Sequence, residues 1–386
     1  MKVSLTEEEE RQVRDFKDWM HENPEVSNEE FETTRRITGF LNSLPGVELL
    51  DLPVETGVLA VVRGGRPGKT VGLRCDIDAL LQTEAYESPH KSLRPGVMHA
   101  CGHDFHTAAV LGAALILSRL RDQMAGDALL LFQKAEETTS GAKEMLEAGL
   151  LRMGRPDCFF GLHNWPMVPA GKVVVKTGGL MSAKTNFLIT IHGKGGHGSM
   201  PHLCTDPIVC AAAMIQSLQT VVSRRTDPLD SVVCSVTSIN GGSRENLVVD
   251  RVEMTAGIRS LSTEAMHRAV EAMENIVKCT AAAYGCTCEI AYREVIPLVD
   301  NSPAMAAIAR KAAVEIVGED NVIDTAPTLA SEDFALIMEQ VPSFLYWFGS
   351  CPPGEEGVAL HQDRFHTDDS AIAVAAAVMA NAVFTA

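Results

Sequence analysis

Apolar runs and helix-length segments alternate along the first half of the chain. Runs of strand length occupy 70–75, 127–133 and 157–162, while the segment 106–120 has the length of a helix and contains no proline. Strands that alternate with helices of this length are typical of a largely parallel sheet. The pattern therefore predicts an α/β fold built on a mixed, largely parallel sheet.

Polar residues follow three of these apolar runs. Asp76 ends the first run, Glu137 comes just after the second, and His163 follows the third. In parallel sheets the ligand site lies at the carboxyl ends of the strands. We therefore expect these three side chains to lie at one edge of the sheet.

The segment 184–295 has a different rhythm. Its apolar pattern predicts the order strand, helix, strand, strand, helix, strand, which is the ferredoxin-like motif. The α/β pattern resumes after it, with a strand over 343–349 and a final helix. We therefore predict a second domain at 184–295 inserted into a first domain made of 1–183 and 296–386.

Length and charge narrow the possible partners. The 386 residues exceed the size at which one hydrophobic core usually keeps growing, which favours two domains. The net charge of −17 and the lack of a basic stripe argue against a nucleic-acid partner.

The start of the chain lacks the basic-then-apolar layout of a signal peptide, and Thr6 and Glu9 have the spacing of a helix capping box. The longest apolar runs, 108–117 and 371–380, are too short to span a bilayer. Ten cysteines without a framework spacing suit reduced thiols. We therefore expect a cytoplasmic protein with no membrane partner.

The stretch HACGHDFHTA, residues 99–108, admits three interpretations. Cys101 could be a nucleophile activated by a histidine, a metal ligand, or a buried loop cysteine, which is the usual interpretation of an isolated Cys-x-His. A metal needs several donors, and Glu137, His163 and His361 supply them. A thiolate mixed with histidines and carboxylates suits Zn, Ni, Co or Mn rather than a calcium cage.

The adjacent acids Glu136 and Glu137 fit a division of labour. An isolated Glu-Glu pair is more often a solvated helix start. Here the pair follows an apolar strand, which favours one carboxylate as a metal ligand and its neighbour as the base for a metal-activated water.

Taken together, the motifs resemble those of the co-catalytic metal amidohydrolases and peptidases, the family of aminoacylase, hippurate hydrolase and the plant hydrolases of auxin–amino acid conjugates. The resemblance covers nearly the whole chain. The segments that carry it, in the family's order, are WMHENPEVSNEEFETT, RCDIDAL, GVMHACGHDFHTA, QKAEE, GLHNWP, GKGGHGSMPH, SEDF and LHQDRFHTDD.

The resemblance implies a role for each matching residue in the first domain. It implies two divalent ions, drawn from Mn, Zn, Ni or Co, and it makes Glu136 the general base. Asp78 would lie behind the site and orient a ligand. The implied ligands are Cys101, His103, Glu137, His163 and His361.

For the inserted domain, the resemblance implies a lid that also forms a homodimer. His197 would reach the partner subunit's site and stabilise the developing oxyanion, while Asn246 and Arg259 would contact the substrate. The expected activity is hydrolysis of the amide of an N-acyl amino acid. A dipeptidase, a carboxypeptidase or an N-acetyl-diaminopimelate deacetylase are alternatives within the family. A non-catalytic metal-binding protein and a thiol hydrolase using Cys101 are rivals from other classes.

Several positions depart from the family pattern. Lys134 stands where proline usually precedes the acidic pair, and His366 stands where aspartate is usual. We expect both near the substrate pocket. His99 and His106 are expected beside the site, whereas a surface or lid position is expected for His21, His90, His192 and His267. Further departures are Leu81, Thr138, Thr139 and the segment NLVVD at 246–250.

Overall fold

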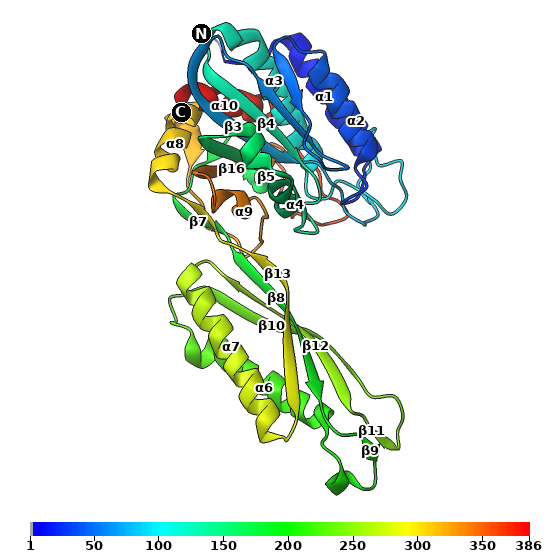
Figure 1. The fold of residues 1–386 in the computed structure, drawn as a ribbon. Helices are drawn as coiled ribbons and strands as arrows, with labels where there is room; N and C mark the ends of the chain where they lie inside the picture. The colour runs from blue at the N-terminus through cyan, green and yellow to red at the C-terminus, as the bar shows by residue number, and fades with distance from the viewer. Residues whose placement is uncertain (1–2) are drawn as a thin grey trace. The chain divides into compact units, whose positions relative to one another are not determined.

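The computed structural model describes residues 3–386, which form two compact units. The first unit comprises the chain up to Gly178 together with Asp300–Ala326 and Asp333–Ala386. The second unit comprises Gly179–Val299 and Pro327–Glu332. The second unit is therefore inserted in the first along the chain, and Figure 1 shows the elements of each.

The first unit contains an eight-stranded mixed sheet in the order β1-β2-β4-β3-β5-β16-β6-β15. Its four central strands, β4, β3, β5 and β16, run parallel to one another, whereas β2 is antiparallel to both β1 and β4, and β6 is antiparallel to β16. The predicted fold class is thus confirmed. The strands are β1 Val47–Leu50, β2 Val58–Val62, β3 Arg66–Asp76, β4 Ala125–Gln133, β5 Cys158–Pro169, β6 Val173–Val174, β15 Val322–Ile323 and β16 Ser343–Cys351.

Helices cover this sheet, and α3 is the most buried of them. All but one of its residues are buried, as expected for a helix that is apolar all round, and it packs against α1 and α10. The predicted capping box of Thr6 and Glu9 is present at the start of α1. The helices are α1 Glu7–Glu22, α2 Phe31–Asn42, α3 His103–Leu120, α4 Gly141–Ala148, α5 Leu150–Gly154, α8 Pro303–Val317, α9 Ala335–Met338 and α10 Ala371–Thr385.

Strand β5 is longer than the sequence pattern predicted. The expectation was a strand over 157–162 that ends at His163, but β5 continues to Pro169. Parallel pairing with β16 holds the extension, and Trp165 stacks on Trp347 with ring centroids 3.8 Å apart. His163 therefore lies inside a strand, paired with Trp347, rather than at a strand end.

The second unit has the predicted elements in the predicted order, β8, α6, β10, β12, α7 and β13, with the short strands β9 and β11 in addition. Its antiparallel sheet has the order β10-β12-β8-β13, and α6 and α7 pack on one another and on the sheet. The bounds are β7 Gly178–Met181, β8 Ala183–His192, β9 Gly196–His197, α6 Pro207–Arg225, β10 Val232–Gly241, β11 Leu247–Val248, β12 Arg251–Ser260, α7 Thr263–Ala283, β13 Thr287–Ile296 and β14 Val299–Asn301.

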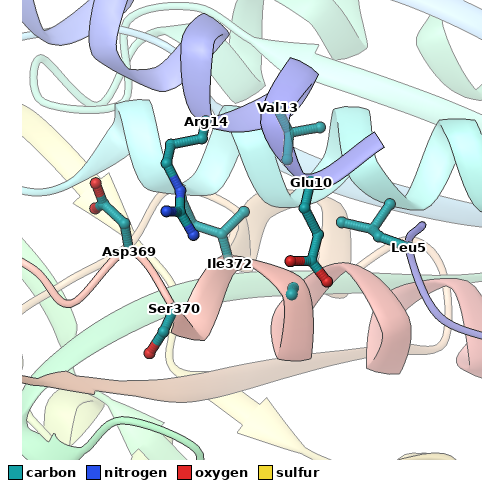
Figure 2. A pocket seen from close by; sticks show the side chains of 8 residues that line it. Leu5, Glu10, Val13, Arg14, Asp369, Ser370 and Ile372 are labelled. Atoms are coloured by element: carbon teal, nitrogen blue, oxygen red, sulfur yellow. The ribbon is translucent and has the colours of Figure 1, made fainter. Parts of the chain in front are cut away.

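A hollow of about 200 Å³ lies between α1 and the start of α10 (Figure 2). Arg14 projects into it from α1 near the acidic Glu10 and Asp369. None of its lining residues is a candidate ligand, so this hollow is separate from the predicted site.

The structure also bears on the expected lack of a membrane-spanning helix and on the expected reduced cysteines. Among the helices of residues 3–386, none is long and apolar enough to cross a membrane. The ten cysteines within the same range are free thiols.

Candidate functional site

The five predicted ligands converge in the first unit from four separate parts of the chain. Cys101 and His103 flank the start of α3, and Glu137 lies in the turn after β4. His163 lies on β5, and His361 lies in the loop that follows β16. The cluster therefore depends on the tertiary fold and not on any single local motif.

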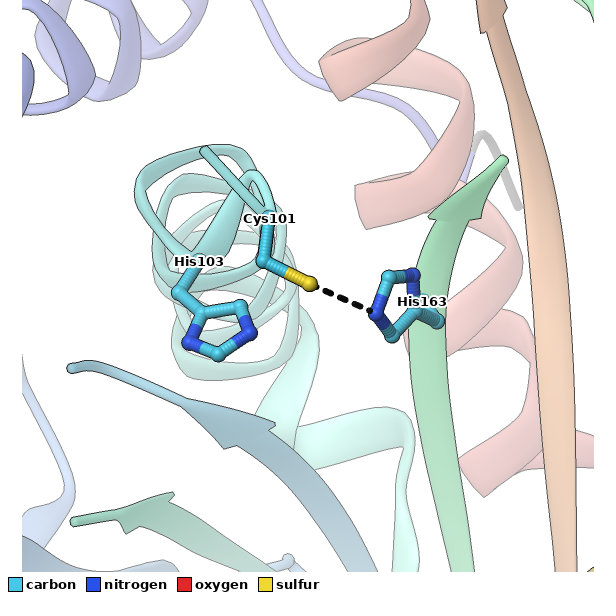
Figure 3. A group of neighbouring side chains, drawn as sticks. All are labelled: Cys101, His103 and His163. Atoms are coloured by element: carbon cyan, nitrogen blue, oxygen red, sulfur yellow. Dashed lines mark hydrogen bonds between the residues drawn. The ribbon is translucent and has the colours of Figure 1, made fainter. Parts of the chain in front are cut away.

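Cys101 lies between the other members of the cluster and contacts two of them. Its Sγ lies 3.5 Å from Nε2 of His163 and 3.3 Å from Nε2 of His361. Nε2 of His361 also lies 3.2 Å from Oε1 of Glu137. Figure 3 shows Cys101 and His103 at the start of α3 and His163 facing the thiol from β5.

The local backbone brings these side chains together at a glycine. Gly102 has a φ of +85° and precedes α3. A Cβ at this position would lie 2.3 Å from the side-chain nitrogen of Asn164, and that same nitrogen donates to the carbonyl of Cys101. Only glycine combines this conformation with so close an approach. The Cys-Gly-His spacing thus has a structural cause.

Hydrogen bonds fix the orientation of two ligand imidazoles. Nδ1 of His163 donates to the carbonyl oxygen of Asn164 at 2.6 Å, and Nδ1 of His103 pairs with Oδ1 of Asp78 at 3.2 Å. In each ring this leaves Nε2 to face the cluster. Such outer hydrogen bonds are the usual way in which proteins orient metal-ligating histidines.

The donor atoms fit a pair of divalent metal ions. Nε2 of His103 and Oε1 of Glu137 are buried and make no hydrogen bond to any described residue. Two groups of three, Cys101-His103-His163 and Cys101-Glu137-His361, each have ligand atoms within 4.8 Å of one another. Buried polar atoms that lack a hydrogen bond are typical of sites that hold an ion or a water molecule. Cys101 belongs to both groups, so its thiolate would be among the residues that hold the ions.

The ionisation of the cluster argues against a thiol nucleophile. Burial, together with the carboxylates of Glu137 and Glu136, raises the pKa of the Cys101 thiol well above its usual range. A reactive cysteine needs the opposite shift. A divalent cation would favour the thiolate, because coordination deprotonates a thiol.

The two buried histidines differ in charge. Burial lowers the pKa of His163 to about 4, so its ring is neutral at pH 7, as a ligand must be. Burial alone would also lower the pKa of His103, but the carboxylates of Asp76 and Asp78 outweigh it and raise that pKa to about 10. A metal at Nε2 of His103 would therefore displace a proton.

Asp78 binds the acidic pair as well as His103. Its Oδ1 accepts the backbone N–H of Glu136 at 3.1 Å, and its Oδ2 accepts that of Glu137 at 3.0 Å. The hydroxyl of Ser27 donates to Oδ2 at 2.6 Å. Glu136 is itself buried, so the acidic pair is not a solvated helix start.

Sequence reasoning missed a buried network behind the ligands. Arg74 is fully buried and pairs with Asp76 at 3.0 Å, and Asp76 in turn pairs with Nδ1 of His106 at 2.5 Å. Nε2 of His106 accepts the backbone N–H of Asn164 at 2.7 Å, next to His163. The sequence marks Asp76 only as the end of a strand, because its contact with His106 joins residues that are distant along the chain.

The residues predicted in the inserted unit lie in two separate places. His197 is exposed on β9, and its neighbour Gly198 donates its backbone N–H to the carbonyl of Asn246 at 2.8 Å. Arg259 lies near the C-terminal end of β12, and its guanidinium is 3.3 Å from the hydroxyl of Ser331. His197 and Asn246 are therefore brought together, and Arg259 is apart from them.

Two residues were expected near the substrate pocket and one at the surface. Lys134 is buried, but its ammonium pairs with Glu144 at 2.8 Å. His366 stacks on Tyr86, with centroids 4.1 Å apart, and pairs with an acid of the neighbouring loop. The surface position expected for His21 is wrong: its ring is buried because it pairs with Asp104 at 2.8 Å and with a second acid at 3.3 Å.

Comparisons with known proteins agree with this geometry. Residues 72–385 match the model of peptidase family M20/M25/M40. An N-acetylcysteine deacetylase of Bacillus subtilis is 38% identical over 357 residues, covering 92% of each chain. A thermostable carboxypeptidase of Saccharolobus solfataricus is 36% identical over 359 residues, covering 90% of each chain.

A solved structure extends the comparison to the fold. A dinuclear metal-binding M20 peptidase of Bacillus subtilis superposes with a TM-score of 0.85 at 33% identity, covering 98% of each chain. The match includes both units. The chain belongs to peptidase family M20/M25/M40 and is a metallohydrolase of that family.

Proposed function

We propose that this protein is a dinuclear metal-dependent amidohydrolase that cleaves the amide bond of N-acyl amino acids. The observation that carries the proposal is the convergence of Cys101, His103, Glu137, His163 and His361 in one largely buried cluster with the carboxylate of Glu136 beside it. The relatives named as deacetylases and carboxypeptidases act on linear amides, which supports the same bond class here.

In the proposed mechanism, two divalent ions of the Mn, Zn, Ni or Co class would polarise the scissile carbonyl and acidify a water molecule. Glu136 accepts the proton of that water and returns it to the leaving amine. Burial of Glu136 and the backbone N–H of Asp333, 3.4 Å from its Oε1, support a carboxylate held in one orientation for this transfer.

A carboxylate beyond the ligand set favours an enzyme over a non-catalytic metal-binding protein. A binding protein needs ligands only, whereas Glu136 adds a buried negative charge next to Glu137. Burying an ionised carboxylate is costly because it is strongly solvated in water, so a buried acid beyond the ligand set favours a catalytic role.

Arg259 is the proposed contact for the substrate's free carboxylate. Its guanidinium is half-buried, and burial lowers its pKa because it removes part of the hydration of the cation. A planar guanidinium suits a carboxylate because two parallel N–H groups match its two oxygens. Asn246 is the second proposed substrate contact, near His197.

A homodimer formed through the inserted unit is part of the proposal. Three exposed apolar residues lie close to His197 along the chain or on the strand that pairs with it: Met200, Leu203 and Leu247. Exposed apolar groups that gather in one place are typical of interaction surfaces. Leu247 on β11 pairs with His197 on β9, which supports the proposal that His197 reaches a partner subunit's site.

Metal dependence is the first test of the proposed function. Dialysis against a chelator should abolish hydrolysis of a panel of N-acyl amino acids, and Mn, Zn, Co or Ni should restore it, because the ligand set needs a divalent ion. Turnover and elemental analysis are measured on the same samples. Full activity in protein shown to be metal-free would refute the proposal, and turnover of dipeptides alone would move the assignment to a dipeptidase.

The two acids can be separated by mutation. Glu136→Ala should lose roughly 10²–10⁴-fold in kcat and keep its metal, because a general base contributes about that much. Glu137→Ala should lose metal together with activity, since its carboxylate belongs to the ligand cluster. Metal content decides between them, and the opposite pattern would mean that the two roles are reversed.

Subunit mixing tests the trans role of His197. Glu136→Ala and His197→Ala proteins are each impaired, but in a mixed dimer one of the two sites regains both groups if His197 acts in trans. Random exchange should therefore restore about a quarter of wild-type activity, since half of the dimers are mixed. Absence of recovery, with exchange proven by tagged subunits, would rule out a trans role.

A further inference from the structure

The turn that carries the acidic pair begins in an unusual backbone conformation. Ala135 is buried and has a φ of +50°, in the left-handed region that residues with a Cβ rarely adopt. Such a conformation persists only where the surroundings hold it in place. The next two residues are Glu136 and Glu137, so the direction of both side chains depends on this one backbone angle.

Three successive backbone N–H groups of this turn donate to carboxylates from distant parts of the chain. The N–H of Ala135 donates to Oε1 of Glu30 at 2.8 Å. The N–H groups of Glu136 and Glu137 donate to the two oxygens of Asp78 at 3.1 and 3.0 Å. Consecutive N–H groups around a left-handed residue form a concave site for anions. Here two carboxylates occupy it.

Glu30 is placed for this contact and not for its own helix. It is fully buried at the position before α2, yet its side chain does not cap that helix. Its second oxygen accepts the hydroxyl of Thr56 at 2.8 Å, which fixes the carboxylate. Glu25 accepts the free N–H of Thr33 in the first turn instead, at 2.8 Å. Glu25, rather than Glu30, therefore binds the first turn of α2.

We propose that Glu30 is a positioning residue for the acidic pair: its carboxylate holds Ala135 in the left-handed conformation and so directs Glu136 and Glu137 into the site. The inference rests on the roles proposed above for these two acids. Without an acceptor at this point, the buried N–H of Ala135 loses its partner. The turn then relaxes to a conformation in which the two side chains point elsewhere.

Two conservative variants of Glu30 separate the effect of side-chain length from the effect of negative charge. Glu30→Gln keeps the length of the side chain, and its amide oxygen still accepts from Ala135. Glu30→Asp keeps the charge but withdraws the carboxylate by one methylene. We expect Glu30→Asp to lower zinc affinity and kcat about 10- to 100-fold with a smaller change in KM, and Glu30→Gln to retain most of both. Equal impairment of the two variants would overturn the proposal.

A second substitution tests the backbone directly. Glycine adopts the left-handed conformation without a steric penalty, so Ala135→Gly in the Glu30→Asp background should recover most of the lost zinc affinity. A double variant as impaired as Glu30→Asp alone would show that Glu30 acts by another route. The reference is the Ala135→Gly single variant, and melting temperatures establish that every variant is folded.

Glu25→Asp is the matched control, because it shortens a buried carboxylate of the same segment that binds α2 and not the acidic pair. It should lower the melting temperature and leave zinc affinity and kcat unchanged. An equal loss of zinc affinity in Glu25→Asp would assign the effect to the whole segment. Zinc affinity is measured by competition with a chromophoric chelator, so the result stands even if wild-type protein hydrolyses no N-acyl amino acid, which would contradict only the proposed function.

Discussion

The carboxylate of Asp78 is the group on which the candidate site depends. It lies just beyond the end of β3, fully buried, and accepts from four donors: the imidazole of His103, the N–H groups of Glu136 and Glu137, and the hydroxyl of Ser27. A buried carboxylate is tolerated when hydrogen bonds replace its hydration. These contacts hold its pKa below the usual value although burial opposes this. One side chain thus connects a ligand from α3 with both acids of the turn after β4.

The sheet supplies the framework for this arrangement. Parallel pairing of β3 with β4 and β5 brings the ends of β3 and β4 to the part of the sheet where β5 carries His163, at the edge where ligand sites of α/β sheets lie. Beneath that edge, the fully buried Arg74 balances Asp76 and Asp333. Acidic groups gathered in a buried place repel one another unless cations offset them. Arg74 and His103 provide part of that charge, and divalent ions are suited to provide the rest.

The sequence predicted the fold class, and strand ends and the Cys-Gly-His spacing are local signals that singled out candidate ligands which lie close together in the fold. It did not predict contacts between distant segments. Glu30 binds a backbone N–H 105 positions away, and Ser27 binds a carboxylate 51 positions away. Strand β5 exceeded its predicted length because pairing with β16 stabilises residues that alternation alone does not mark. His21 was misplaced for the same reason, since its partner Asp104 lies on another helix.

The most direct test of this account is the metal affinity of Asp78→Asn, measured by titration calorimetry with zinc or manganese. Each oxygen of Asp78 accepts from two donors, so the NH₂ group of an asparagine would face two of the four donors whichever way the amide turns. The five ligands remain, yet the account predicts that affinity falls about 10- to 100-fold, as expected when an outer partner of a ligating histidine is lost. Unchanged affinity and stoichiometry in a folded Asp78→Asn protein would contradict the claim that this carboxylate organises the site.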